Sequence, residues 1–147
     1  MMLTGFLKKS ANAGWWYAEC DVIGVAAQGK SRKDAASSLA EAIEVKIGRD
    51  DFTARVCETG PGEGGAIIVI VTSDRPEVLA AEVLKHQRTM NKLTLAAVAK
   101  KLGVSSISSY AAYEQGTRAP TLAKFQELLA AVAPEMVMTV GPRKAVR

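Results

Sequence analysis

The sequence predicts an α+β fold in which a small sheet domain precedes an all-helical domain. Three observations predict it. Short apolar stretches run through the first half, one amphipathic helix interrupts those stretches, and helical spacing dominates after Pro76. We place a β-β-β-α-β-β domain at residues 1–74, an all-α domain of four or five helices at 75–134, and a C-terminal tail at 135–147. Arg75-Pro76 marks the hinge, because proline fits the first turn of a helix.

Five short strands are expected in the first domain. Three precede its helix, at residues 2–9, 14–19 and 25–28, and glycine-containing turns separate them. Residues 52–58 alternate between apolar and polar types, as in a half-buried strand, and residues 66–72 form a continuous apolar run typical of a central strand. The expected arrangement is therefore a small sheet with one helix packed on a face.

The helix of the first domain has clear start and stop signals. Ser31 is a suitable N-cap, and Gly48 follows the last apolar residue, where a helix end favours a left-handed residue. Between them, apolar residues recur at helical spacing on one face, which we expect to pack on the sheet. These residues are Ala35, Leu39, Ala40, Ile43 and Ile47.

The most informative stretch runs from Thr94 to Thr121. Thr94 is a suitable N-cap for a short helix, and Gly103 follows the last apolar residue of that helix. Ser105 can cap a second short helix, and Pro120 with Thr121 opens a third. The apolar faces are Leu95, Val98, Ala99 and Leu102 in the first helix and Ile107, Tyr110 and Ala111 in the second, with Tyr113 as a further packing residue.

Two short helices joined by a tight turn have the layout of a DNA-reading helix-turn-helix. Helices of about 8 residues do not hold alone in water, so we expect them within a compact bundle. The second helix of such a pair is the one presented to the major groove of double-stranded DNA.

The charge distribution agrees with this interpretation. Residues 1–74 carry 8 Lys and Arg against 10 Asp and Glu, for a net charge of −2, whereas residues 75–147 carry 11 against 5, for a net charge of +6. A basic half favours a polyanion, because neutralising phosphates releases counterions. The alternative is that +6 is only a solvated surface.

The candidate DNA-binding residues lie in and around the second short helix. Serine hydroxyls at its start can contact bases or phosphates, although they discriminate bases weakly. The cations that flank the helix pair are expected to hold phosphates. The set is Thr94, Lys100, Lys101, Ser105, Ser106, Ser108, Ser109, Gln115 and Arg118. Because this base-reading set is modest, we expect a homodimer or homotetramer on a roughly palindromic operator, with half-sites about 34 Å apart or a multiple of that.

Other chemistries have little support. The GPGEGG stretch at residues 60–65 matches a dinucleotide-binding pattern, but a strand follows it instead of a helix, so we expect a hairpin loop. His86 is the only histidine and is expected on an exposed helix surface. Cys20 and Cys57 lack metal-type spacing and are expected as buried free thiols. No metal or cofactor is expected. The N-terminus lacks a signal peptide and no apolar run is long enough to span a bilayer, so we expect a cytoplasmic protein without membrane contact.

A family resemblance appears at residues 14–45, GWWYAECDVIGVAAQGKSRKDAASSLAEAIEV. An aromatic strand ending near an acidic residue leads to Gly24-Val25 and Gln28-Gly29, and then to an alanine-rich helix from Lys33 to Val45. This order resembles the N-terminal domain of HicB antitoxins, and the helix-turn-helix variant at residues 105–116 is similar to one often fused to it. The resemblance covers about residues 2–134. The family pattern usually has a proline before the glycine of the Gly-Val pair or near it. This chain has Ile23 at that position and so departs from the pattern.

The resemblance implies an antitoxin. Its N-terminal domain would resemble a degraded RNase H fold and neutralise a HicA-like toxin, a small basic protein that cleaves mRNA. Its C-terminal domain would bind the promoter of its own operon. We expect no enzyme activity, because a nuclease of the RNase H type needs several carboxylates around Mg²⁺ and the first strand, residues 2–9, contains none.

Four residues are expected to face the toxin: Trp15, Trp16, Glu19 and Asp21. Adjacent tryptophans in a strand point to opposite faces, so one can be core while the other anchors an interface. The outward tryptophan could instead pack under a loop or in a homodimer seam. The carboxylates are expected to meet basic residues of the toxin.

A second hypothesis is a stand-alone transcription regulator whose N-terminal domain binds a ligand or only dimerises. A small basic reading frame beside the gene would favour the antitoxin, and its absence would favour the stand-alone regulator.

Overall fold

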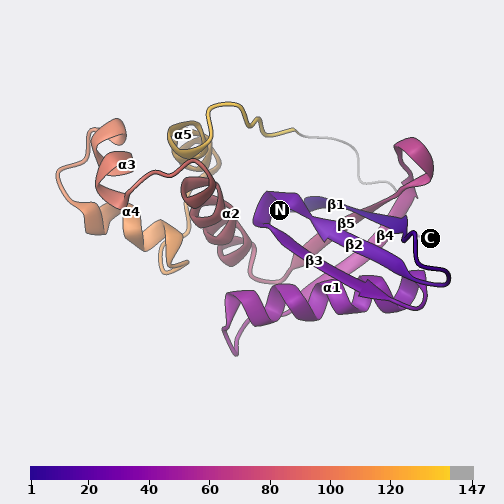
Figure 1. The fold of residues 1–147 in the computed structure, drawn as a ribbon. Helices are drawn as coiled ribbons and strands as arrows, with labels where there is room; N and C mark the ends of the chain where they lie inside the picture. The colour runs from indigo at the N-terminus through magenta and orange to yellow at the C-terminus, as the bar shows by residue number, and fades with distance from the viewer. Residues whose placement is uncertain (140–147) are drawn as a thin grey trace. The chain divides into compact units, whose positions relative to one another are not determined.

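The structure is a computed structural model that describes residues 1–139. These residues form two compact units, Met1–Pro76 and residues 77–139, and each is described by itself. The first unit contains a five-stranded sheet with one long helix and the second contains helices only, so the α+β fold class is confirmed (Figure 1).

The sheet of the first unit is antiparallel throughout, with the strand order β3-β2-β1-β5-β4. Its pairing register places Leu7 opposite Ala18 and Gly5 opposite Val69, so that buried side chains of neighbouring strands share one face. The apolar run at residues 66–72 becomes the interior strand β5, between β1 and β4. The strands are β1 (Leu3–Lys9), β2 (Trp16–Cys20), β3 (Val25–Gly29), β4 (Ala54–Pro61) and β5 (Ile67–Ser73).

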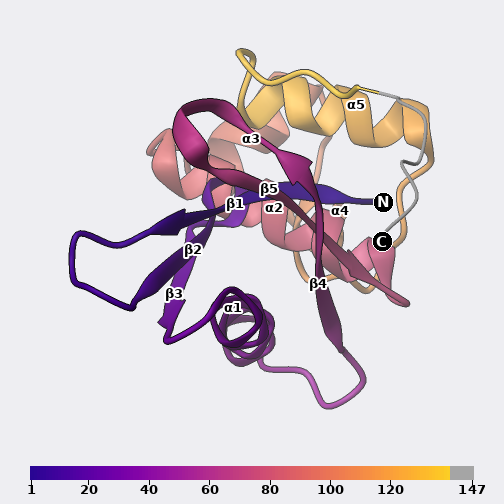
Figure 2. The same cartoon turned by 90° about the vertical axis from the view of Figure 1, so that its right-hand side faces the viewer.

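Helix α1 (Arg32–Ile47) lies against one face of this sheet, as Figure 2 shows in a view nearly along its axis. Its buried residues are Ala35, Leu39 and Ile43, which confirms three of the five expected apolar positions, whereas Ala40 and Ile47 are half-buried. The Ser31 hydroxyl accepts a hydrogen bond from the Asp34 amide at 3.0 Å and caps the helix as expected.

Gly29 joins β3 to the start of α1 because no side chain fits there. A β-carbon at this position would lie 2.4 Å from the backbone nitrogen of Ala35. The Gln28-Gly29 pair noted in the sequence therefore has a packing reason. It lets the third strand pass directly against the first turn of the helix.

The second unit consists of four helices. Val98, Tyr110, Phe125 and Leu128 are buried, and contacts of α3 with α4 and with α5 hold the short helices together. The Asn91 side-chain amide also donates to the carbonyl oxygen of Val132 at 2.7 Å, which joins the end of α2 to the end of α5. The helices are α2 (Pro76–Met90), α3 (Leu95–Leu102), α4 (Ile107–Glu114) and α5 (Leu122–Val132).

Two details differ from the sequence-based expectations. The second strand begins at Trp16, because Trp15 closes the β1–β2 turn by accepting a hydrogen bond at its carbonyl from the Ser10 amide at 2.9 Å. The alternation of apolar and polar types at residues 136–140 also predicts a strand at the start of the tail, but no strand forms at residues 136–139. Residues 140–147, most of the expected tail, lie outside the described part of the chain.

Candidate nucleic-acid interface

Helices α3 and α4 form the helix pair that the sequence predicts. Thr94 caps α3 by accepting a hydrogen bond from the Ala97 amide at 3.0 Å. Gly103 ends the helix in the left-handed conformation, with φ of 68°, and the Val104 amide donates back to the Ala99 carbonyl at 3.1 Å. This tight ending reverses the chain within a few residues and brings α4 against α3.

The start of α4 differs from the expectation in two respects. Ser106 is the N-cap residue, not Ser105, and it makes no side-chain capping bond, because its hydroxyl pairs with that of Ser108 at 2.5 Å. Ile107, expected on the buried side, is 48% exposed. Helix α4 begins one residue later than expected, and this shift places Ile107 at its first position, outside the core.

The first turn of α4 therefore presents both hydroxyl and apolar groups to solvent. Ser105, Ser108 and Ser109 are exposed beside Ile107, and Ser106 is half-buried. Hydroxyls can exchange hydrogen bonds with base edges and phosphates, and an aliphatic side chain can contact the methyl group of thymine. Ile107 could not be assigned to this surface from the sequence, because its apolar character matches the core pattern of the helix.

A buried ionic network fixes the other end of α4. The carboxylate of Glu114 accepts hydrogen bonds from Arg88 at 2.6 and 3.1 Å and from the Tyr110 hydroxyl at 2.5 Å. Arg88 also donates to the carbonyl oxygen of Leu93 at 2.9 Å. Two causes hold the pKa of Tyr110 well above its usual value: burial, which has the larger effect, and the hydrogen bond to Glu114. The Tyr110 hydroxyl therefore keeps its proton and donates it in the hydrogen bond. The network joins the end of α2 to the end of α4.

The bond to Glu114 also raises the pKa of Arg88 above its already high value. The side chains of Arg88 and Glu114 are only 18% and 7% exposed, so both charges are shielded from water. Neither residue was singled out from the sequence. Their positions are 26 residues apart, and no local pattern links them.

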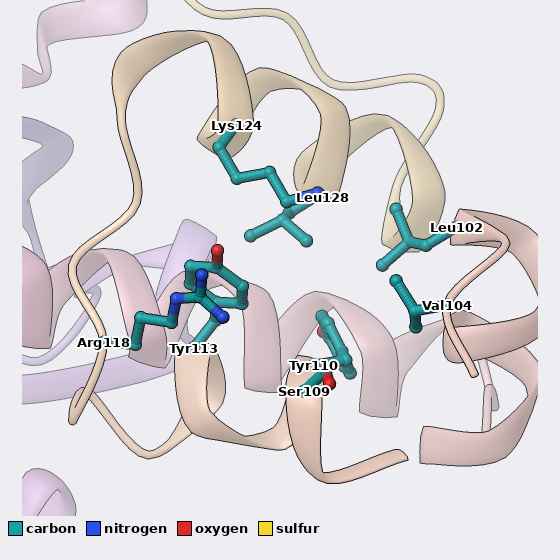
Figure 3. Close-up of a pocket in the computed structure, with 8 residues that line it drawn as sticks. All are labelled: Leu102, Val104, Ser109, Tyr110, Tyr113, Arg118, Lys124 and Leu128. Carbon is teal, nitrogen blue, oxygen red and sulfur yellow. The ribbon is translucent and has the colours of Figure 1, made fainter. Parts of the chain in front are cut away.

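A pocket of about 260 Å³ lies beside α4 (Figure 3). The guanidinium of Arg118 stacks on the ring of Tyr113, with its central carbon 5.1 Å from the ring centroid. Lys124, near the start of α5, points its ammonium toward Leu128 and pairs with Glu127 at 3.3 Å. Two cations thus flank the C-terminal part of α4. The lining residues are Leu102, Val104, Ser109, Tyr110, Tyr113, Arg118, Lys124 and Leu128.

The predicted phosphate-binding residues have different surroundings. Lys100, Gln115 and Arg118 are exposed. Lys101 is also exposed, but its ammonium donates to the carbonyl oxygen of Ala131 at 3.3 Å, so it contacts the end of α5. The hydroxyl of Thr94 is engaged in capping α3. Phosphate binding at this position would therefore use the backbone amides at the start of α3.

Both tyrosines of α4 are buried, with Tyr110 at 1% and Tyr113 at 7% exposure. The expectation that Tyr113 packs is confirmed. It also orients Arg118, because its ring supports the guanidinium.

The residues expected to face a toxin lie in the first unit, and neither tryptophan is core. Trp15 is 36% exposed and Trp16 is half-buried, so the possibility that one of them is a core residue is not realised. The α1 face of β2 is filled by the fully buried Ala18 and Cys20, while Trp16 lies at the beginning of the strand, in contact with cations. Glu19 pairs with Lys8 at 3.3 Å, and Asp21 is exposed.

The other sequence motifs have structural roles. Gly60 and Pro61 end β4, residues 62–65 lie in the β4–β5 connection, and no helix of the kind a dinucleotide site needs follows them. Cys20 and Cys57 are free thiols, the first buried and the second half-buried. His86 is half-buried in α2, not exposed as expected. Within residues 1–139, no three His, Cys, Asp or Glu residues are grouped to hold a metal ion, and no helix is long and apolar enough to cross a membrane.

Comparison with known families identifies the second unit. Residues 84–132 match the helix-turn-helix family, and this match spans the end of α2 and all of α3, α4 and α5. No curated protein and no solved structure matches the chain. The match and the geometry of the helix pair agree, so the second unit is a helix-turn-helix domain, and the chain is supported as a DNA-binding regulator.

Proposed function

We propose that this protein represses the operon that encodes it and is the antitoxin of a toxin–antitoxin pair. The observation that carries the first part is the helix-turn-helix match at residues 84–132, together with the exposed first turn of α4. In this proposal α4 enters the major groove and its first-turn side chains contact base edges. Repression follows if the operator overlaps the promoter.

Affinity in this proposal comes mainly from phosphate contacts. Lys100 at the end of α3 and Arg118 after α4 are exposed cations on either side of the helix pair. Lys124, which lines the same pocket as Arg118, is a further candidate. Phosphate contacts fix the orientation of the protein on the duplex, while the first-turn residues of α4 read the sequence.

A footprinting experiment tests the repressor role. The purified protein is incubated with a duplex that carries the region upstream of its own gene, and protection is compared with that on a duplex of shuffled sequence. We expect protection of a roughly palindromic site of two half-sites on the upstream region alone. Equal protection of both duplexes, or of neither, would contradict autoregulation.

The antitoxin role rests on the resemblance of residues 14–45 to the HicB family, and it assigns the first unit to binding a small basic toxin that cleaves mRNA. Trp15, Trp16, Glu19 and Asp21 remain the candidate contacts. Asp21 is exposed and suits a basic partner, whereas Glu19 already pairs with Lys8. In the same proposal the first unit has no nuclease activity of its own.

Messenger RNA half-life tests the antitoxin role. A small basic reading frame next to the gene is expressed alone and together with this protein. We expect the neighbour to shorten mRNA lifetimes and this protein to restore them. A neighbour without effect, or one that this protein fails to counter, would leave a stand-alone DNA-binding regulator.

A further inference from the structure

One end of the sheet in the first unit carries three consecutive aromatic residues. Trp15 closes the β1–β2 turn, and Trp16 and Tyr17 begin β2. Trp15 is 36% and Tyr17 38% exposed, and Trp16 is half-buried. Large aromatic side chains on the surface of a small unit give up favourable burial, so their exposure points to a ligand that covers them.

Cations from two segments, the end of β1 and the β3–α1 junction, contact the two indole rings. The ammonium of Lys9, at the end of β1, lies 5.8 Å from the ring centroid of Trp16, and the guanidinium carbon of Arg32, at the start of α1, lies 5.9 Å from it. The ammonium of Lys30, after β3, lies 6.0 Å from the ring centroid of Trp15. The fold therefore builds this group from positions far apart in the sequence. Tyr17 points to the opposite face of β2 from Trp16 and is not part of this group. We call the group the aromatic edge: Lys9, Trp15, Trp16, Lys30 and Arg32.

The local charge is opposite to that of the unit as a whole. Residues 1–74 have a net charge of −2, yet the aromatic edge contains three cations and no carboxylate. The charge of Arg32 is already paired, because its guanidinium donates two hydrogen bonds to the carboxylate of Glu58. Lys9 and Lys30 are exposed, and their contacts with indole rings leave their positive charges in place. The charge of this surface therefore suits an anionic ligand.

We propose that the aromatic edge binds single-stranded nucleic acid. Exposed rings offer stacking platforms for unpaired bases, and neighbouring cations hold the phosphates that link those bases. A duplex is a poorer ligand, because its bases already stack on one another. An acidic peptide would use the cations but not the rings. The inference concerns the first unit and stands apart from duplex binding by the second, although it competes with toxin docking for Trp15 and Trp16.

Intrinsic fluorescence gives a direct test, because Trp15 and Trp16 are the only tryptophans of the chain. The full-length protein is titrated with single-stranded oligothymidylate and oligouridylate. We expect saturable quenching whose apparent affinity falls with salt, with a log–log slope of about −1.4 for two cations, Lys9 and Lys30, that each contact a phosphate. A matched duplex and poly-glutamate are expected to quench weakly.

Two variants locate the site, and two controls accompany them. Trp15→Ala and Lys30→Ala alter exposed side chains outside the strands, and thermal melting verifies that both variants fold. Removing one stacked ring is expected to weaken binding about 5- to 150-fold, with Trp16 as the remaining reporter. Trp15→Phe should keep most of the affinity. Lys100→Ala in the second unit should leave quenching unchanged and weaken duplex binding.

Any one of three results would overturn the proposal. It fails if the oligonucleotides do not quench, if poly-glutamate binds as well as they do, or if Trp15→Ala and Lys30→Ala bind like the parent protein. Duplex binding, followed in parallel by anisotropy of a labelled operator, distinguishes this failure from failure of the regulator role.

Discussion

The two units use ion pairs in opposite ways. In the first, Arg55 and Asp74 pair at 2.8 Å with side chains 58% and 77% exposed. In the second, Arg88 and Glu114 pair at 2.6 Å with side chains 18% and 7% exposed. An exposed pair contributes about 0–1 kcal/mol, whereas breaking a buried one costs about 3–5 kcal/mol because a charge is left without a partner.

The difference follows from the size of the elements. Helix α1 has 16 residues and packs on a five-stranded sheet, so the first unit is held by apolar surface. Helices α3 and α4 have 8 residues each and depend on their neighbours for stability. The Arg88–Glu114–Tyr110 network supplies a directional contact that a small apolar core alone does not provide. It thereby positions the helix that we assign to DNA.

The largest expected effect comes from breaking the buried network. Glu114→Ala removes the acceptor of both Arg88 and Tyr110, so we expect a loss of about 3–5 kcal/mol in the free energy of unfolding of the second unit. The matched control is Asp74→Ala, which breaks an exposed pair and should cost at most about 1 kcal/mol. Urea unfolding measures both. Equal effects would show that burial does not separate the two pairs.

A smaller effect is expected at the surface of α4. Ile107→Ser removes apolar contact with DNA and should weaken operator binding by about 1–2 kcal/mol without destabilising the protein, because Ile107 is already 48% exposed. Val45→Ser, at an 81% exposed position of α1, is the control and should bind normally. Anisotropy with a labelled operator measures the difference. Normal binding by Ile107→Ser would place Ile107 outside the interface.

The stability of the protein at acidic pH tests an exposed ionic cluster of the first unit, which consists of Arg49, Asp51 and Arg75. Hydrogen bonds from Arg49 and then Arg75 hold the pKa of Asp51 well below its ordinary value of 3.8. A lowered folded-state pKa stabilises the protein above that ordinary value, and the contribution is lost as the pH falls below it. Asp51→Asn should therefore lower the melting temperature slightly at pH 7, and the difference from the parent should shrink toward pH 2. A difference that persists unchanged in acid would contradict this assignment.

The smallest effect concerns the two thiols. Burial raises the pKa of Cys20 to about 11, and its side chain is fully buried, so it should resist iodoacetamide at pH 8. Cys57 is half-buried and should react first. Mass spectrometry of partially alkylated protein measures the order in which the two thiols react. Faster labelling of Cys20 would mean that the sheet face beneath α1 opens readily.

Sequence patterns predicted the elements because their signals are local. Ser31, Thr94, Gly48 and Gly103 act within one helical turn, and the structure places each at the helix end expected from the sequence. The alternation of strands and the period of helices likewise depend on near neighbours. The α+β class and the helix pair followed from these signals.

The features that were missed depend on partners distant in the chain. Arg88 and Glu114 meet only after α2 and α4 pack, and the cations around Trp15 and Trp16 come from two segments that are distant in the sequence. The exposure of Ile107 was mistaken for burial, because an apolar residue at a helix start has the same local signal in a core and in an interface. Tertiary packing, and not the local sequence, decides which residues meet in these groups and whether Ile107 is exposed.

The salt dependence of duplex binding tests the central claim, that the second unit binds double-stranded DNA, most directly. Dissociation constants are measured from low to moderate salt for the parent protein and for Arg118→Ala, an exposed cation beside α4. We predict a linear log–log relation for the parent and a slope smaller by about 0.9 for the variant, the value of one phosphate contact on B-form DNA. A folded protein that binds duplex DNA without salt dependence, or not at all, would contradict the account.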